Sequence, residues 1–312
     1  MMIPGLFKDL FKRPELNLAW IFVLINALVF LFSITFFSKW PSDALSSRLK
    51  DKNFSVSLTE MYVQTLDPIE KAKLNLANIP MQALRDNRFW KKVTYFPFSG
   101  DQVQVEQNRK MLVQFQKEYT NSAQYQLGLG SIETSPWAWL TYQFTHASLI
   151  HFLGNIIFIF LIISYLELEV GFFWLVSIYL LGGFAGGLTY LLFDGPGSMA
   201  MVGASASASA LMAFLMIIKK NQLMPWSYMI APLPGGYGVI YLPAFFIFPL
   251  FLMADFTSVL WEPSGVQSAV AVSAHIGGTL CGILLGGIYL FEEKLKAHFI
   301  KLGLVAEKEI VD

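Results

Sequence analysis

The sequence carries little charge. Asp, Glu, Lys and Arg make up 14% of its 312 residues, and the formal net charge is zero. Soluble domains contain about 25% charged residues, and proteins that bind nucleic acid present an excess of Lys and Arg. The composition therefore excludes an ordinary soluble domain and gives no electrostatic case for nucleic acid. Because 55% of the residues are hydrophobic, it indicates a polytopic membrane protein.

Cysteine and metal-binding motifs are scarce as well. Cys281 is the single cysteine and lies in an apolar run, so one chain can form neither a disulfide nor a cysteine-based metal site. We interpret Cys281 as a packing residue. The sequence has no H-E-x-x-H motif and no pair of membrane aspartates, which excludes the zinc and aspartyl types of intramembrane protease. We expect no cofactor and no metal ion.

Long apolar runs, in contrast, are abundant. A bilayer-spanning helix needs about 20 apolar residues, and we expect six spans, at 18–37, 147–166, 171–193, 205–218, 238–256 and 268–290. The first run is too long for a signal-peptide core and lacks a clear cleavage site, so we read it as an uncleaved anchor. Glycines at four-residue spacing make one narrow face of the last span. We expect the short helix 205–218 to pack centrally against that face, formed by Gly278, Gly282 and Gly286.

The expected fold class is an all-α membrane protein, a six-helix bundle with a soluble insertion after the first span. Residues 38–134 are hydrophilic and show broken helical periodicity, so this insertion should be mainly helical. It contains no histidine and no cysteine, and no catalytic constellation is visible in it. The domain organisation predicted from these runs is an N-terminal segment 1–17, the anchor 18–37, the insertion 38–134, a core with five further spans at 135–291 and a tail 292–312.

The distribution of basic residues predicts the orientation. Outside the insertion, Lys and Arg occur only within 1–17, at 219–220 and within 292–312, while the short loops 194–204 and 257–267 have none. By the positive-inside rule both termini are cytoplasmic. The insertion then lies on the opposite side of the membrane. The expected localisation is multi-pass in a cell membrane, the inner membrane in a bacterium.

Polar residues of three spans fall at a similar depth. Ser205 begins helix 205–218 from the outer side, where the helix dipole and free N–H groups stabilise an anion. His275 lies about 10 Å below the outer end of the last span, at 1.5 Å per residue. Ionisable groups inside a membrane usually face the bundle interior and mark function. The outer half of the second span adds His146, His151 and Asn155.

These residue types fit a serine nucleophile and its base. Serine needs a base to take its proton, and His275 is the histidine on the two small-residue helices expected to pack together. No Asp or Glu lies at this depth, so a Ser–His dyad is predicted rather than a triad. His151 and Asn155 are four residues apart on one helix face and can donate to an oxyanion, where each donor contributes about 3–4 kcal/mol. His146 lies on another face and is interpreted as supporting.

The residues resemble the motifs of the rhomboid family of intramembrane serine proteases. His146, His151 and Asn155 match its H-x4-H-x3-N helix; Gly203-Ala204-Ser205 matches its G-x-S motif; Ala274-His275 with Gly278 matches its A-H-x-x-G motif. Glu167 and Pro136-Trp137 resemble further family positions, while Ala138, Ala206 and Ser209 depart from the family pattern.

The resemblance implies a serine-type endopeptidase that hydrolyses peptide bonds in or beside the transmembrane segments of single-span or other membrane proteins, within the lipid bilayer. It implies Ser205 as nucleophile, His275 as base, and His151 with Asn155 as oxyanion donors. His146, Gly203 and Gly278 would support the site. Hydrolysis needs water, so we expect a polar cavity between the second, fourth and sixth spans beneath loop 194–204.

Two alternative functions are considered. A catalytically inactive relative would bind and escort membrane proteins, although the intact Ser205 and His275 argue against it. A transporter or metal permease would use His146, His151 and His275 as ligands, but His146 and His151 point to different faces and no acidic residue shares their site. In the predicted fifth span, Pro243 and Pro249 either kink a helix or form a gate for substrate entry.

Overall fold

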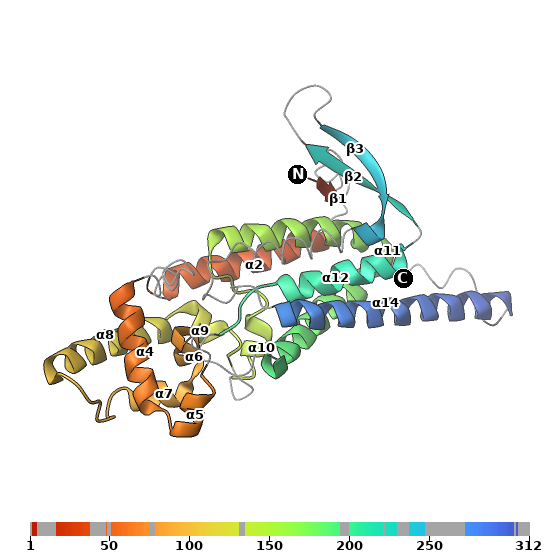
Figure 1. The fold of residues 1–312 in the computed structure, drawn as a ribbon. Helices are drawn as coiled ribbons and strands as arrows, with labels where there is room; N and C mark the ends of the chain where they lie inside the picture. Colours follow the sequence, from red (N-terminus) through yellow and green to blue (C-terminus); the bar gives the residue numbers. More distant parts are fainter. Residues whose placement is uncertain are drawn as a thin grey trace.

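The computed structural model describes residues 2–4, 17–37, 48, 51–74, 79–130, 135–193, 200–220, 222–229, 237–246, 272–302 and 304. Within them, long apolar helices form a bundle (Figure 1). A cluster of shorter helices lies at one end of this bundle, and a small sheet lies at the other end. The bundle is built from α2 (Asn17–Phe36), α11 (Leu149–Phe193), α12 (Ser205–Ile218) and α14 (Val272–Lys301).

A single glycine divides α11 into two membrane-length helices. Gly171 has φ 73°, a left-handed conformation that side chains with a Cβ rarely adopt. Four helical segments of the described chain are long and apolar enough to cross a membrane: Leu18–Phe36, Leu149–Glu167, Glu169–Phe193 and Val272–Lys301. They lie where spans were predicted at 18–37, 147–166, 171–193 and 268–290, and α12 has the bounds predicted for the short helix. The protein is thus a mainly helical integral membrane protein.

One predicted span is wrong at its start. Residues 237–243 form strand β3 (Tyr237–Pro243), followed by the 3-10 turn η2 (Ala244–Phe246), so no helix begins at 238. Tyr, Val and Ile favour the extended conformation, and a short apolar run does not distinguish a strand from a helix. Pro243 ends a strand and kinks no helix. The remaining residues 247–256, including Pro249, lie outside the described part.

The sheet also corrects the all-α prediction. β1 (Met2–Pro4), β2 (Leu223–Met229) and β3 form an antiparallel sheet in the order β1-β2-β3. Met2 lies opposite Tyr228, and Leu223 lies opposite Pro243. The sheet lies where α12 ends and α2 begins (Figure 1). The N-terminal segment and the segment after Lys219 and Lys220, both predicted on one side of the membrane, therefore lie at the same end of the bundle.

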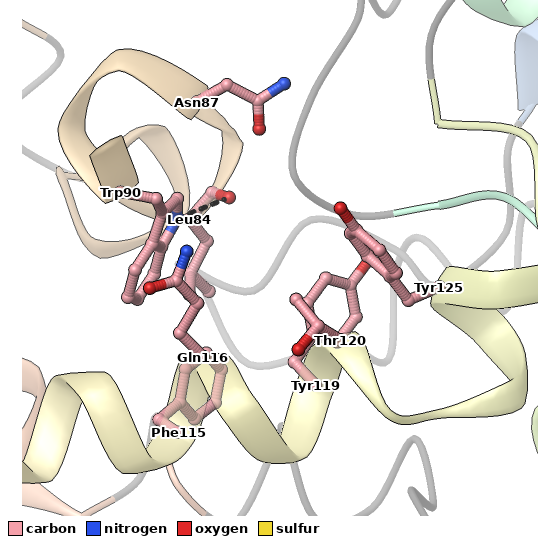
Figure 2. Close-up of a pocket in the computed structure, with 8 residues that line it drawn as sticks. All are labelled: Leu84, Asn87, Trp90, Phe115, Gln116, Tyr119, Thr120 and Tyr125. Carbon is pink, nitrogen blue, oxygen red and sulfur yellow. Dashed lines mark hydrogen bonds between the residues drawn. The ribbon is translucent and has the colours of Figure 1, made fainter. Parts of the chain in front are cut away.

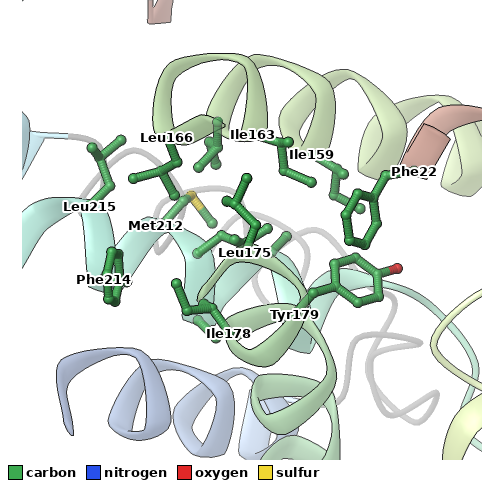
Figure 3. Packing of buried hydrophobic residues seen from close by; sticks show 14 of the residues in the cluster. Phe22, Ile159, Ile163, Leu166, Leu175, Ile178, Tyr179, Met212, Phe214 and Leu215 are labelled. Atoms are coloured by element: carbon green, nitrogen blue, oxygen red, sulfur yellow. The ribbon is translucent and has the colours of Figure 1, made fainter. Parts of the chain in front are cut away.

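The bundle core surrounds α12. Residues 206–215 of this helix are all buried, whereas α2 and α14 expose large apolar side chains of the kind that face lipid. The prediction that the short helix is central is therefore confirmed. Figure 3 shows side chains from α2, both halves of α11 and α12 meeting in one cluster, among them Phe22, Ile159, Ile163, Leu166, Leu175, Ile178, Tyr179, Met212, Phe214 and Leu215.

Glu167 joins the first helix to the bundle. One carboxylate oxygen of Glu167, Oε1, accepts a hydrogen bond from the backbone N–H of Leu18 at 2.8 Å, and Oε2 accepts one from Ala19 at 3.2 Å. A carboxylate at a helix N-terminus satisfies free N–H groups and complements the helix dipole. This contact gives a structural role to the acidic residue that ends the first half of α11.

Glycines allow α14 to touch the backbone of α12. A Cβ built on Gly278 would lie 2.1 Å from the carbonyl oxygen of Ala206, and one on Gly282 would lie 2.1 Å from that of Ala210. Because the contacts advance together along both helices, α12 and α14 run parallel in constant register. The predicted packing of the Gly278–Gly282 face on α12 is confirmed.

This contact predicts that a Gly→Ala substitution on α14 destabilises the protein at one position and not at another. Gly282→Ala should destabilise the protein by about 1–3 kcal/mol, since a methyl group there collides with backbone rather than with a movable side chain. Gly287→Ala on the same helix is the matched control, because a Cβ at Gly287 has no atom within 4 Å. Thermal unfolding in detergent measures the difference. Equal unfolding midpoints for the two variants would contradict the packing described.

The segment between α2 and α10 (Ala138–Thr141) folds into short helices. They are α4 (Lys52–Thr65), α5 (Pro68–Ala72), α6 (Ile79–Arg85), α7 (Asn87–Lys92), α8 (Gln102–Thr120) and α9 (Ala123–Leu127). Side chains of the preceding residues cap α4, α5, α7, α8 and α9 by accepting a hydrogen bond from an N–H of the first turn; they are Asp51, Asp67, Asp86, Asp101 and Ser122. These helices have a hydrophobic core of their own, which includes Phe54, Leu58, Phe89, Trp90 and Phe115.

Candidate active site

Ser205 is the first residue of α12 and follows a loop that depends on glycine. Gly203 has φ 130°, in the region that L side chains rarely adopt, and its N–H donates to the carbonyl oxygen of Tyr142 at 2.9 Å. Ala204 is the N-cap residue and offers no side-chain acceptor to the first N–H groups of α12. Those N–H groups, together with the positive end of the helix dipole, form a site that favours an anion.

The imidazole of His151 lies against Gly203. A Cβ at position 203 would be 2.8 Å from His151 Cε1, 2.9 Å from its Nε2 and 3.8 Å from Ser205 Oγ. Any side chain at position 203 would therefore displace the imidazole, which explains the glycine two residues before Ser205 independently of its φ. The His151 ring and the Ser205 hydroxyl lie on the same side of this loop.

His275 lies on the α14 face that contacts α12. It shares this face with Gly278 and Gly282, three and seven residues later, and it is only 5% exposed. Since Gly278 faces Ala206, His275 is one turn nearer to the end of the bundle at which α12 begins. Helices α11, α12 and α14 thus bring His151, Ser205 and His275 to one end of the bundle.

Asn155 and His146 flank His151. Asn155 Nδ2 donates to the carbonyl oxygen of His151 at 2.9 Å, and an amide has a second N–H with which to donate. His146 is buried; its Nδ1 lies 3.2 Å from the carbonyl oxygen of Phe144, and its ring stands edge-on to the His151 ring at a centroid distance of 5.3 Å. His146 therefore packs against the His151 ring, as expected of a residue that supports the site.

The neighbouring serines have other partners. Ser207 Oγ donates to Gln143 Oε1 at 3.2 Å, and Ser209 Oγ donates to the carbonyl oxygen of Ser205 at 2.8 Å. Both serines are fully buried in the helix packing, whereas Ser205 is partly exposed. Their hydroxyls take part in hydrogen bonds within the helix packing, so Ser207 and Ser209 contribute to that packing.

Some site-forming residues were missed by the sequence reasoning. Tyr142 holds Gly203 with its carbonyl oxygen, and its hydroxyl donates to the carbonyl oxygen of Gly183. Gln143 accepts from Ser207, and its Nε2 donates to the carbonyl oxygen of Trp139 at 2.9 Å. These bonds join residues that no short motif connects.

Two further expectations concern water and metal. The polar cavity predicted beneath loop 194–204 stays a prediction, since residues 194–199 lie outside the described part. Among the residues that the structure describes, no group of three or more His, Cys, Asp or Glu side chains could hold a metal ion.

The fold and the site define an integral membrane protein with a serine and three histidines at one end of its helix bundle. A family model described as the Rhomboid domain matches residues 133–292, about half of the chain. The chain belongs to the rhomboid family, whose members are generally serine intramembrane proteases acting on transmembrane substrates within the bilayer. A comparison with curated protein sequences gives no match. Helix α2 and the helices α4 to α9 precede the matched region.

Proposed function

We propose that the protein is an intramembrane serine endopeptidase that uses a Ser205–His275 dyad. Its substrates are single-span or other membrane proteins, cut in or beside a transmembrane segment. The observation that carries the proposal is the glycine-mediated contact of α14 with α12. It supports the dyad because His275 precedes Gly278 by three residues, less than one helical turn, and Gly278 contacts Ala206, the residue after Ser205.

The reaction follows from the roles of these groups. His275 accepts the proton of Ser205 Oγ, and the oxygen attacks the carbonyl carbon of the scissile peptide bond. The negative charge that develops on the carbonyl oxygen is stabilised by the N-terminus of α12, with His151 and Asn155 as donors. His275 then gives its proton to the leaving amine as the tetrahedral intermediate collapses to an acyl-enzyme. Water, activated by His275, attacks the ester bond and regenerates Ser205.

The same proposal includes an orientation. We place both termini and the sheet β1-β2-β3 on the cytoplasmic side, with the active site and helices α4 to α9 at the opposite side as a soluble insertion. The charge pattern supports this, since Lys219 and Lys220 follow the end of α12 that is remote from Ser205. Lys219 is held there by an ion pair with Glu169 at 2.7 Å.

The experiment that tests the function is cleavage in a bilayer. Wild-type protein and Ser205→Ala are each reconstituted into lipid vesicles with single-span substrates, and products are identified by mass spectrometry. Wild type should cut near the outer membrane boundary, and Ser205→Ala should not. A protein that only binds and escorts membrane proteins would capture substrate equally well in both forms and release no product.

A further inference from the structure

The end of the helical insertion is attached directly to the loop that precedes Ser205. Leu129 and Met201 form an antiparallel bridge with two backbone hydrogen bonds of 2.9 Å. The hydroxyl of Tyr119 accepts a hydrogen bond from the N–H of Ala200 at 2.7 Å. The amide of Gln124 donates to the carbonyl oxygen of Ala200 at 2.8 Å. Both backbone polar groups of Ala200 are thus bound by side chains of the insertion.

This attachment is close-fitting. Ala200 and Tyr119 are only 4% and 5% exposed, and Leu129 is fully buried. A Cβ at Gly128 would lie 2.9 Å from both the Ala200 Cβ and the carbonyl oxygen of Met201, so the two segments can approach only because residue 128 is glycine. The contact is therefore buried and closely packed.

The loop 200–204 lacks side chains that could fix its backbone conformation by hydrogen bonds. Residues 200–204 read Ala-Met-Val-Gly-Ala and carry no side chain that could hydrogen-bond to the loop backbone. Beyond Met201, the Gly203 N–H is bound by the carbonyl oxygen of Tyr142. The backbone that leads into Ser205 is consequently shaped from outside, by the insertion at one end and by the segment before His146 at the other.

Tyr119 is itself held firmly. It lies in the last turn of α8, and its carbonyl oxygen accepts a hydrogen bond of 2.6 Å from Ser122 Oγ. Its ring forms one wall of a cavity of about 50 Å³, which Trp90 and Phe115 also line (Figure 2). Burial raises the pKa of Tyr119 above its ordinary value, so the hydroxyl stays neutral. Its hydroxyl is therefore a neutral hydrogen-bond acceptor on a residue whose backbone and ring are both held by the insertion.

We propose that Tyr119 and Gln124 are positioning residues: by binding Ala200 they hold the Gly203–Ser205 turn in the geometry that the dyad requires. The insertion thereby acts as a brace for the nucleophile rather than as a separate module. This inference rests on the proposed protease function. Errors of about 1 Å in the placement of reacting groups cost on the order of 100-fold in rate, so the loss of one fixed point on this loop should be visible in catalysis.

The test is Tyr119→Phe, which removes the hydroxyl and keeps the ring. The matched control is Tyr62→Phe, a buried tyrosine of the insertion that is 6% exposed and whose hydroxyl bonds Asp86 at 3.4 Å. We expect Tyr119→Phe to lower kcat and the rate of fluorophosphonate labelling about 10- to 100-fold with KM little changed. Tyr62→Phe should stay within about twofold of wild type.

Hydrogen exchange tests the positioning role of Tyr119 independently of enzyme activity. Hydrogen exchange followed by mass spectrometry should show faster exchange of the loop peptide containing residues 200–205 in Tyr119→Phe, but not in Tyr62→Phe. Equal rates and equal exchange in the two variants would overturn the positioning role. If the two variants show the expected exchange difference but wild type neither cleaves substrate nor is labelled, the positioning role is supported and the protease assignment fails.

Discussion

Ser205→Ala is expected to reduce peptide-bond hydrolysis by about 10⁶-fold, to the limit of detection, because the acyl-enzyme route requires its oxygen. The structure gives this serine a place that differs from that of its neighbours. It begins α12 beside Gly203 and the imidazole of His151, while the hydroxyls of Ser207 and Ser209 hold other groups. The rate of product formation from a single-span substrate in vesicles measures the effect.

The two other serines of α12 supply controls for Ser205→Ala. Ser209→Ala removes a hydrogen bond to the carbonyl oxygen of Ser205 and should retain most activity. Ser207→Ala leaves Gln143 Oε1 without this buried donor. The variant should be about 1–3 kcal/mol less stable, and the rate of its chemical step should change little. Loss of hydrolysis in Ser207→Ala with activity preserved in Ser205→Ala would move the nucleophile and contradict the assignment.

His275→Asn should have the second large effect. Removing the base costs about as much as removing the nucleophile when the two act as a unit, so we expect a loss of about 10⁴- to 10⁶-fold in kcat. Labelling by a fluorophosphonate should fall as well, since this reagent also needs an activated serine oxygen. Asparagine keeps a polar side chain that is smaller than histidine and reaches as far as the imidazole Nδ1, which limits damage to the contact of α14 with α12.

Two histidine variants separate the roles in the site. His151→Asn should lower kcat by about 10²- to 10³-fold, as the loss of one oxyanion donor does. His298→Asn, at an exposed position in the last turn of α14, should behave as wild type. A His275→Asn protein that retains cleavage within about tenfold of wild type would exclude this histidine as the base.

The apolar helices and their contacts could be predicted from sequence because their signals are local. The bounds of α12 follow from the Ser-Ala alternation after Gly203 and from Lys219 at its end. The close contact of α14 follows from the glycines at four-residue spacing, and Gly278 and Gly282 do meet the α12 backbone. Glycine and helix periodicity carry this information without any knowledge of the partner.

The sheet and the brace could not be predicted in this way. Met2–Pro4 pairs with a strand more than 200 residues away, and pairing between distant segments has no spacing that a local pattern records. The run of Val239 and Ile240 was compatible with either a helix or a strand until its partner β2 was known. Likewise, the bond of Tyr119 to Ala200 joins positions 81 residues apart through a backbone N–H. Backbone groups are alike at every residue and leave no mark in the sequence.

The most direct test of the Ser205–His275 dyad is the site of covalent modification. Wild-type protein in detergent or vesicles is treated with a fluorophosphonate, digested and analysed by mass spectrometry. The dyad predicts one phosphonylated serine, Ser205, with the adduct lost in His275→Asn and kept in His298→Asn. An adduct on another serine, or undiminished modification of Ser205 without His275, would contradict the dyad.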